Sequence, residues 1–242
     1  MRDKTKEFIV EGTTGVAEAL GSRYRVKALF VQSPMPGHVE PLMLQAEKAS
    51  VPVFEVSESV MSYMSPATTP PGAIAIAEFV DRPAAELVAL DLDLTVVLCD
   101  VRDPGNVGTI LRTTWACGAG AAFLGSTAAD VYNPKVVRAT AGALFHLPFA
   151  RDVDVARTLQ DLKGRSLLVA ADAEASQAIW DVGLSGPVTL ILGNEAWGLP
   201  DEVLAAADVQ ACVPLSESAE SLNVGIAAAV FLFEAIRQRR GV

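Results

Sequence analysis

The sequence is poor in the residues that redox chemistry, metal binding and most acid–base catalysis use. It contains three cysteines and two histidines among 242 residues. Cys99, Cys117 and Cys212 are odd in number, far apart and set in apolar sequence, so we expect buried thiols, with no disulfide and no metal site. His38 lies in a Pro/Gly-rich loop and His146 in an apolar run, and neither has a hydrolase motif beside it. Histidine-based catalysis is therefore not expected.

Long apolar runs are also missing. No run approaches the roughly 20 residues that a membrane span needs, and the first residues, MRDKTKEFIVEG, lack the apolar stretch of a signal peptide. We therefore expect a soluble, cytoplasmic protein with no membrane partner. Hydrophobic residues nevertheless make up 51% of the chain, which is ample material for one large or two modest cores.

Positive charge is in short supply, since the formal net charge is −10. This argues against non-specific coating of nucleic acid, because such binding depends on lysine and arginine at the phosphates. A localised basic face stays compatible with the sequence, as does ordinary solvated surface charge. Seven of the 19 basic residues fall within the first 48 positions, and six of them form two clusters: Arg2, Lys4, Lys6 and Arg23, Arg25, Lys27.

What the sequence does have is alternation of strand and helix patterns. Within residues 1–80, strands are predicted at FIVEG (8–12), VKALFVQ (26–32), VPVFEV (51–56) and AIAIAEFV (73–80). Helices are predicted between them at VAEAL (16–20), VEPLMLQAEKA (39–49) and SESVMSYMS (57–65). These elements predict a small α/β domain over 1–80. Residues 81–93 carry a proline and no clear strand period, which predicts a linker.

Residues 94–242 contain short apolar runs followed by turns or helix starts: TVVLC, AAFLG, SLLVAAD, VTLILG and VQACVP. Continuous apolar strands separated by helices are typical of a parallel sheet that is covered on both faces. Ligands of such sheets usually bind in the loops that follow the carboxyl ends of the strands. The fold class is therefore α/β, and the loops are where we expect the chemistry.

Three loops of this half have unusual compositions. DPGNVGTILR contains two glycines that let a backbone or ligand come close, with Asn106 placed to cap a helix. LILGNEAWGLPDEV has a tight turn that holds Glu195 and Trp197. VPLSESAESLNV leads into a long helix from about Ser221 to Arg240. Taken singly, the polar residues have ordinary explanations as caps, solvated acids or surface residues of a helix.

Taken together, the loops resemble the three signature motifs of the SpoU (TrmH) branch of the SPOUT RNA methyltransferases, in the same order. NPKVVRATAGALFHLP (133–148) also looks like the family's segment between the first two motifs, and FIVEG followed by VAEAL resembles the start of its substrate-binding domain. The motif matches are NxGxxxR at Asn106, Gly108 and Arg112, LGNExxGL from Leu192 to Leu199, and SLNV from Ser221 to Val224.

The resemblance implies transfer of a methyl group from S-adenosylmethionine to a ribose 2′-hydroxyl of rRNA or tRNA. It implies a catalytic domain over 94–242 with a deep trefoil knot, formed by the loops at 192–199 and 213–224, and an RNA-binding domain over 1–80. It also implies cofactor contacts, largely through backbone groups, at these positions: Leu192, Gly193, Val213, Leu215, Leu222 and Asn223.

The polar site residues carried over from the family are Asn106, Arg112, Glu195, Ser221 and Asn223. A sulfonium donor is already activated, so transfer needs positioning and help with the hydroxyl proton, and no metal. An arginine is effectively never deprotonated in a protein. We therefore expect Arg112 to stabilise the developing alkoxide and to clamp a neighbouring phosphate, for which its planar fork of donors is suited.

Alternatives to this interpretation differ in what they require. An inactive RNA-binding protein of the same fold is expected to lack at least one of the five polar residues, and none is lacking. A nucleotide-cofactor oxidoreductase needs a dinucleotide glycine fingerprint, and GNVG has the wrong spacing. The RNA stays open: a ribosomal site, a tRNA position or an antibiotic-resistance target on rRNA.

A homodimer is expected from the family and from the last helix. VGIAAAVFLFEAIR is apolar nearly all round until Arg237. Such a helix must be buried on several faces, either within one subunit or against a second copy.

Overall fold

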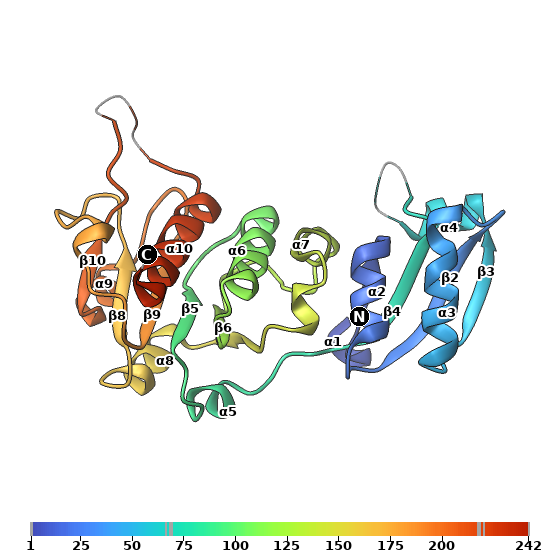
Figure 1. Cartoon of the computed structure of the whole chain (residues 1–242), viewed down its shortest axis with the longest axis horizontal. Helices are drawn as coiled ribbons and strands as arrows, with labels where there is room; N and C mark the ends of the chain where they lie inside the picture. The colour runs from blue at the N-terminus through green and yellow to red at the C-terminus, as the bar shows by residue number, and fades with distance from the viewer. Residues whose placement is uncertain (1, 66, 68–69, 217–218, 220, 242) are drawn as a thin grey trace. The chain divides into compact units, whose positions relative to one another are not determined.

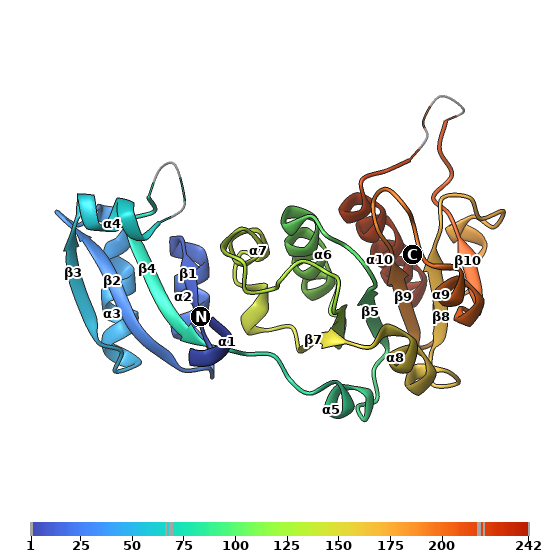
Figure 2. The same cartoon turned by 180° about the vertical axis from the view of Figure 1, so that it is seen from behind.

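The computed structural model describes residues 2–65, 67, 70–216, 219 and 221–241 (Figures 1 and 2). It divides into two compact units, each of which is described by itself. The first consists of Met1–Val80 with Val131–His146, and the second of Asp81–Asp130 with Leu147–Val242.

The first unit is built on a four-stranded sheet in the order β1-β4-β2-β3. The strand β4 runs antiparallel to β1 and β2, while β2 and β3 are parallel. The strands are β1 (Glu7–Glu11), β2 (Val26–Ser33), β3 (Val53–Ser57) and β4 (Ala73–Glu78). The helices are α1 (Arg2–Thr5), α2 (Thr13–Gly21), α3 (Glu40–Lys48), α4 (Glu58–Met64) and α7 (Pro134–Thr140), with 3-10 turns at Gly37–Val39 and Ala143–Phe145. The strands and helices predicted within 1–80 are thereby confirmed.

Residues 131–146 belong to this first unit, although the sequence predicted them as part of 94–242. The Tyr132 ring lies 4.7 Å from that of Phe8 and 3.9 Å from that of Phe79, measured between centroids. The backbone N–H of Val80 donates to the Tyr132 hydroxyl at 2.8 Å. The buried carboxylate of Glu11 on β1 forms an ion pair with Arg138 of α7. Contacts between residues 52 to 127 positions apart are invisible in local sequence patterns, which explains the difference.

The second unit contains a six-stranded, wholly parallel sheet in the order β10-β8-β9-β5-β6-β7. Its strands are β5 (Leu94–Leu98), β6 (Ala121–Gly125), β7 (Phe149–Val153), β8 (Leu167–Ala171), β9 (Val188–Leu192) and β10 (Val209–Ala211). All residues of β5, β6 and β9 are buried, as continuous apolar strands predict. The parallel sheet is confirmed. The edge strand β7 was not predicted, because Arg151 and Asp152 interrupt its apolar pattern.

Helices cover both faces of this sheet. On one face, Val97, Phe123 and Ile191 form a core with residues of α5, α8 and α9. On the other, α10 packs on β9 and α6. The helices are α5 (Ala84–Val88), α6 (Pro104–Ala116), α8 (Val155–Leu162), α9 (Asp201–Ala206) and α10 (Val224–Arg240), with a 3-10 turn at Ile179–Asp181. None of the helices in the described part of the chain is long and apolar enough to cross a bilayer. The threading that defines a trefoil knot stays a prediction.

Residues 81–93 are predicted from the sequence as a linker, but in the structure they belong to the second unit. They contain α5, whose Leu87 is fully buried in the core of the second unit. The segment is short and carries a proline, which hides a helix whose burial depends on α8 and β7.

All three cysteines are free thiols. Cys99 and Cys117 are buried as expected, whereas Cys212 is only half-buried, which corrects the expectation for it. Burial raises the pKa of the Cys99 thiol, with a further contribution from the charges of Asp100 and Glu202. Burial likewise raises the pKa of Cys117, against the opposing charge of Arg240. Both thiols are therefore protonated and poor nucleophiles at neutral pH.

Candidate active site

Three loops of the second unit meet at the carboxyl ends of β5 and β9. These strands are neighbours in the sheet, with Leu98 paired to Leu192 at their ends. One loop follows β5 and enters α6, one follows β9, and one precedes α10, which packs on α6. The three loops that the sequence singled out therefore lie together at this edge of the sheet.

The start of α6 presents the Asn106 side chain to the other loops. The sequence predicted Asn106 as the helix cap, but the cap is Asp103, whose carboxylate accepts from the backbone N–H of Asn106 at 2.9 Å. Pro104 occupies the first turn, where its missing N–H costs nothing. Because Asp103 satisfies the backbone, the amide of Asn106 is left for other contacts.

A continuous chain of hydrogen bonds joins the three loops. The Nδ2 of Asn223 donates to the Oδ1 of Asn106 at 2.8 Å, across 117 positions of sequence. The Nδ2 of Asn106 donates in turn to the Oε1 of Glu195 at 2.6 Å. The Oδ1 of Asn223 accepts from the backbone of Gly225 and Ile226 and so caps α10. The helix therefore begins at Val224, three residues after the start expected near Ser221.

These contacts define the chemistry of the cluster. Asn106 must present its oxygen to Asn223 and its nitrogen to Glu195, which fixes the orientation of both amides. The relay ends on the exposed carboxylate of Glu195, one oxygen of which takes the bond from Asn106. The cluster thus offers a negatively charged acceptor whose position is set by two other loops.

The turn after β9 leaves no room for a side chain at its first position. A Cβ on Gly193 would lie 2.4 Å from the carbonyl oxygen of Gly198. Backbone hydrogen bonds between Asn194 and Gly198 close the turn in both directions, at 2.8 and 3.0 Å. Gly198 adopts a positive φ of 69°, which glycine accepts without strain. The turn projects residues 195–197 from the sheet edge.

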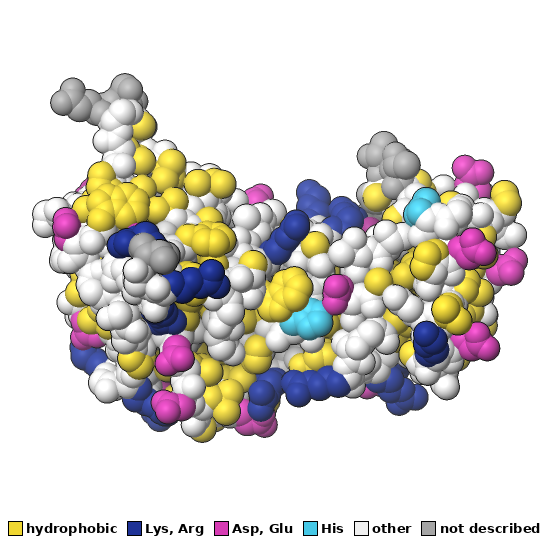
Figure 3. Space-filling model, viewed as in Figure 1, with side chains coloured by type: hydrophobic (Ala, Val, Ile, Leu, Met, Phe, Trp, Pro, Cys, Tyr) yellow, Lys and Arg dark blue, Asp and Glu magenta, His cyan; other side chains and the backbone are white. Residues whose placement is uncertain are grey.

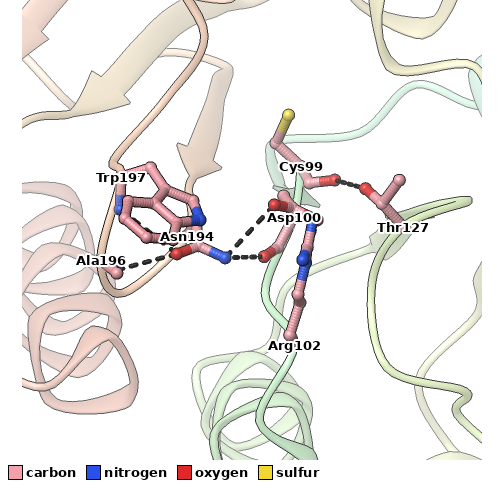
Figure 4. A network of polar contacts seen from close by, with 7 residues as sticks. All are labelled: Cys99, Asp100, Arg102, Thr127, Asn194, Ala196 and Trp197. Atoms are coloured by element: carbon pink, nitrogen blue, oxygen red, sulfur yellow. Dashed lines mark hydrogen bonds and ion pairs between the residues drawn. The ribbon is translucent and has the colours of Figure 1, made fainter.

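A second polar network anchors this turn to the end of β5 (Figure 4). The Nδ2 of Asn194 donates to the carbonyl and the carboxylate of Asp100, at 3.0 and 3.2 Å. Its Oδ1 accepts from the backbone of Ala196 and Trp197, at 2.8 and 3.3 Å. Asp100 also accepts from the Nε of Arg102 at 2.9 Å. One asparagine thereby ties the turn to the neighbouring strand.

Comparison with known proteins agrees with this geometry. Residues 93–233 match the SpoU rRNA Methylase family, and residues 1–75 match the MRM3-like substrate binding domain. The chain belongs to the SpoU rRNA Methylase family. The three residues that the hydrogen-bond relay joins all lie within the matched residues 93–233.

Relatives of this SpoU-family chain match it along nearly its whole length. It is 32% identical to the 23S rRNA (guanosine(2553)-2′-O)-methyltransferase RlmP of Bacillus subtilis, covering 96% of this chain and 89% of the relative. It is 29% identical to a 23S rRNA (uridine(2479)-2′-O)-methyltransferase of Streptomyces viridochromogenes, covering 98% and 85%. An AdoMet-bound rRNA methyltransferase from Sinorhizobium meliloti superposes with a TM-score of 0.85 at 33% identity, covering 98% of this chain and 89% of that one.

Two of the five predicted polar residues lie outside the relay. Arg112 is exposed on α6 and makes no hydrogen bond or ion pair with any described residue. Ser221 is also exposed and makes no such contact within the described part of the chain. The structure therefore brings together Asn106, Glu195 and Asn223, and leaves a guanidinium available on the first helix of the site.

The predicted cofactor residues lie at the same sheet edge or in the loop before α10. Leu192 and Gly193 are buried at the end of β9, and Val213 is half-buried just beyond β10. Leu215 and Leu222 expose their side chains in the loop that ends at Asn223. Large exposed apolar side chains next to a polar cluster are suited to the face of an aromatic ligand.

The Asp100–Asn194 contact was not predicted from the sequence. Burial raises the pKa of Asp100, but hydrogen bonds from Arg102, Thr127 and Asn194 and the charge of Arg102 outweigh it, so that the pKa lies below its usual range. The carboxylate is therefore ionised at neutral pH. The available signal was an acid directly after a buried apolar strand, which indicates a polar role at the sheet edge and does not identify the partner.

Proposed function

We propose that this SpoU-family methyltransferase transfers the methyl group of S-adenosylmethionine to a ribose 2′-hydroxyl of ribosomal RNA, through a site built on Asn106, Glu195 and Asn223. The observation that carries the proposal is the relay of two hydrogen bonds that joins the three motifs. Ribosomal RNA is favoured over tRNA because the named 23S rRNA methyltransferases match 96% and 98% of this chain. Two solved relatives whose titles name tRNA match only 63% and 65% of it. The 23S rRNA methyltransferases differ in nucleotide, so the target base is not carried over.

The residues fit the cofactor that the family uses. Leu215 and Leu222 offer exposed apolar surface, while Leu192 and Gly193 end a strand beside a turn that is held by backbone contacts. When bound, S-adenosylmethionine supplies a methyl group on a cationic sulfonium. The carboxylate of Glu195 suits a positively charged ligand, because opposite charges attract each other.

The chain's own task is to hold the hydroxyl and stabilise its charge. In our proposal, Glu195 accepts a hydrogen bond from the 2′-hydroxyl while Asn106 keeps the carboxylate in place. As the hydroxyl proton passes to the carboxylate of Glu195, the negative charge that develops on the 2′-oxygen is stabilised by the guanidinium of Arg112, which also meets a phosphate. Arg112 is suited to this role because it is exposed and has no ionic partner among the described residues.

A homodimer is proposed from the exposed apolar face of α10 and α6. Ile226 and Phe233 are 53% and 57% exposed and lie seven residues apart, which places them on one side of α10. Trp115 on the adjoining α6 is 38% exposed. Figure 3 shows hydrophobic side chains on the surface of the second unit over these helices. Light scattering at micromolar concentration is expected to give the mass of a dimer, and a monomer mass would contradict the proposal.

Recruitment of the RNA is assigned to the first unit. The support is the match of residues 1–75 to a substrate binding domain and the basic residues in its sequence. We place the reaction in the cytoplasm, where a bacterial-type ribosomal RNA substrate is available.

The proposal is tested with ribosomal RNA from cells that lack the gene. The purified protein and S-adenosylmethionine carrying a labelled methyl group are incubated with this RNA, which is then digested to nucleosides. Label in a 2′-O-methylnucleoside supports the proposal, and loss of that label in Asn106→Ala with unchanged thermal melting assigns the relay. Label on a base, or RNA binding without transfer, would overturn it; the latter is the outcome expected of an inactive RNA-binding protein.

A further inference from the structure

The turn after β9 exposes a tryptophan beside the relay. Trp197 is 78% exposed, against 48% for Trp180 and 38% for Trp115. A large aromatic side chain in water forgoes the stabilisation that burial would give it. Trp197 lies two residues after Glu195, a separation of at most about 7 Å along the chain. The site therefore carries an aromatic surface that the fold itself does not use.

Trp197 is held in a closed turn. Its backbone N–H donates to Asn194, whose side chain also reaches Asp100 on the neighbouring loop (Figure 4). The paired hydrogen bonds of Asn194 and Gly198 enclose the turn on both sides of Trp197. The ring is therefore presented in a defined place at little further cost in backbone ordering, as an element that binds a ligand requires.

We propose that Trp197 stacks on a nucleobase of the RNA substrate, at the methylated nucleotide or its immediate neighbour, and so contributes to selection of the target. This rests on the proposed function, since it needs a ribose at Glu195. Sequence-specific recognition of RNA favours unstacked bases laid on aromatic side chains. A nucleotide that brings its 2′-hydroxyl into the relay loses stacking on its neighbours, and an adjacent indole replaces part of it. The basic partner of the same network, Arg102, keeps 63% of its side chain exposed and suits the adjoining phosphate.

The first test separates RNA binding from cofactor binding. Trp197→Ala is expected to raise the KM for ribosomal RNA by about 5-fold to 150-fold, the range measured for loss of one base–aromatic stack. Trp197→Phe should recover most of this, while kcat changes less than KM. Affinity for S-adenosylmethionine and the melting temperature should stay as in the wild type. Trp180→Ala removes a half-exposed tryptophan that lies outside the three motifs and is the matched control.

The second test observes the ring directly. In the double variant Trp115→Phe/Trp180→Phe, Trp197 is the remaining tryptophan. Ribosomal RNA from cells lacking the gene is expected to quench its fluorescence, and S-adenosylmethionine alone is not. Because this arm measures binding, it tests the inference even where no methyl transfer is detected, which would be a failure of the proposed function alone.

Three outcomes would overturn the inference. The first is that the wild type and Trp197→Ala methylate RNA with the same KM. The second is loss of cofactor affinity in that variant with RNA affinity retained, which would make Trp197 a cover for the cofactor. The third is a fluorescence shift that follows protein concentration and not RNA, which would place the ring in a contact between copies.

Discussion

Folding affects the motif loops of the second unit and the basic clusters of the first unit in opposite ways: it joins polar residues of the former and pairs part of the charge of the latter. Two hydrogen bonds bring the motif residues together although they are far apart in the sequence. Asn106 is 89 positions from Glu195 and 117 positions from Asn223. The cluster that contains Lys27 is contiguous, yet Lys27 forms ion pairs with Glu7 and Glu78 from two other strands. Folding therefore assembles the polar cluster from distant residues, whereas it neutralises part of the charge that the sequence places in the basic cluster.

Within the second cluster, Arg23 and Lys27 differ most. Arg23 lies over the ring of Tyr24, with its guanidinium 5.2 Å from the centroid, and forms no ion pair with a described residue. Arg25 has an ion pair with Glu78 at 3.6 Å and is largely exposed. The free positive charge of the cluster is therefore concentrated toward its start, next to a half-buried aromatic ring.

Arg112 gives the largest expected effect on the motif side of this comparison. Arg112→Ala should lower turnover by roughly 10²-fold to 10³-fold, the scale for loss of one preorganised donor at an anionic transition state. Stability should change by no more than about 0.5 kcal/mol because the side chain is exposed. Arg112→Lys should recover little, since an ammonium lacks the planar fork. Single-turnover methylation, cofactor binding and thermal melting decide the matter, and unchanged turnover in a folded Arg112→Ala enzyme would remove Arg112 from the mechanism.

Gly193→Ala tests whether the site depends on the close approach at the β9 turn. The added methyl group would lie 2.4 Å from the Gly198 carbonyl oxygen, so the backbone must move, at a cost of about 1–3 kcal/mol. Gly183→Ala is the control in the same unit, because a Cβ there meets no atom within 4 Å. Denaturant unfolding measures both variants. Equal midpoints for Gly193→Ala and the wild type would show that the turn adapts freely.

Arg23 and Lys27 test the charge side of the comparison. Arg23→Ala is expected to weaken binding of ribosomal RNA about 5-fold and to reduce the slope of log affinity against log salt by about 0.7–0.9, the loss of one phosphate contact. Lys27→Ala should leave the slope unchanged, because Lys27 is paired within the sheet. Filter binding over a range of salt concentrations measures both. The reverse order would show that the ion pairs open when RNA binds.

Asp100→Asn gives the smallest effect and depends on pH. The pKa of Asp100 lies below its usual range in the folded protein, so its ionised form contributes stability above the ordinary Asp pKa of about 3.9. That contribution is lost as the pH falls through the lower folded value. At pH 7 the free energy of unfolding of the wild type should exceed that of Asp100→Asn by about 0.2–1 kcal/mol. This difference should vanish in strong acid. A difference that is independent of pH would assign the effect to packing.

The sequence predicts the fold well where local periodicity and burial agree. The buried strands β5, β6 and β9 read as continuous apolar runs, whereas the edge strand β7 does not, because Arg151 and Asp152 interrupt its apolar pattern. The helix α5 and the placement of residues 131–146 were missed for a different reason. Both depend on partners that are far away in the sequence, such as the ring of Phe8 against Tyr132.

The sequence motifs predict three of the polar side chains that meet at the sheet edge, whereas the details of their contacts follow from no motif or pattern. The meeting of Asn106 with Glu195 follows from two loops at neighbouring strand ends. The choice of cap does not, because Asp103 and Asn106 are both good caps and only the first turn of the helix selects between them. The role of Asn194 depends on its reach to Asp100 across the sheet edge, which no spacing along the chain predicts.

The central claim is that this chain methylates a ribose 2′-hydroxyl of ribosomal RNA. The most direct measurement maps 2′-O-methylation across the ribosomal RNA of cells with the gene, without it, and with Arg112→Ala in its place. We predict one 2′-O-methylated nucleotide that is present with the wild-type gene and absent in both other strains. An identical set of 2′-O-methylated nucleotides in all three strains would contradict the account.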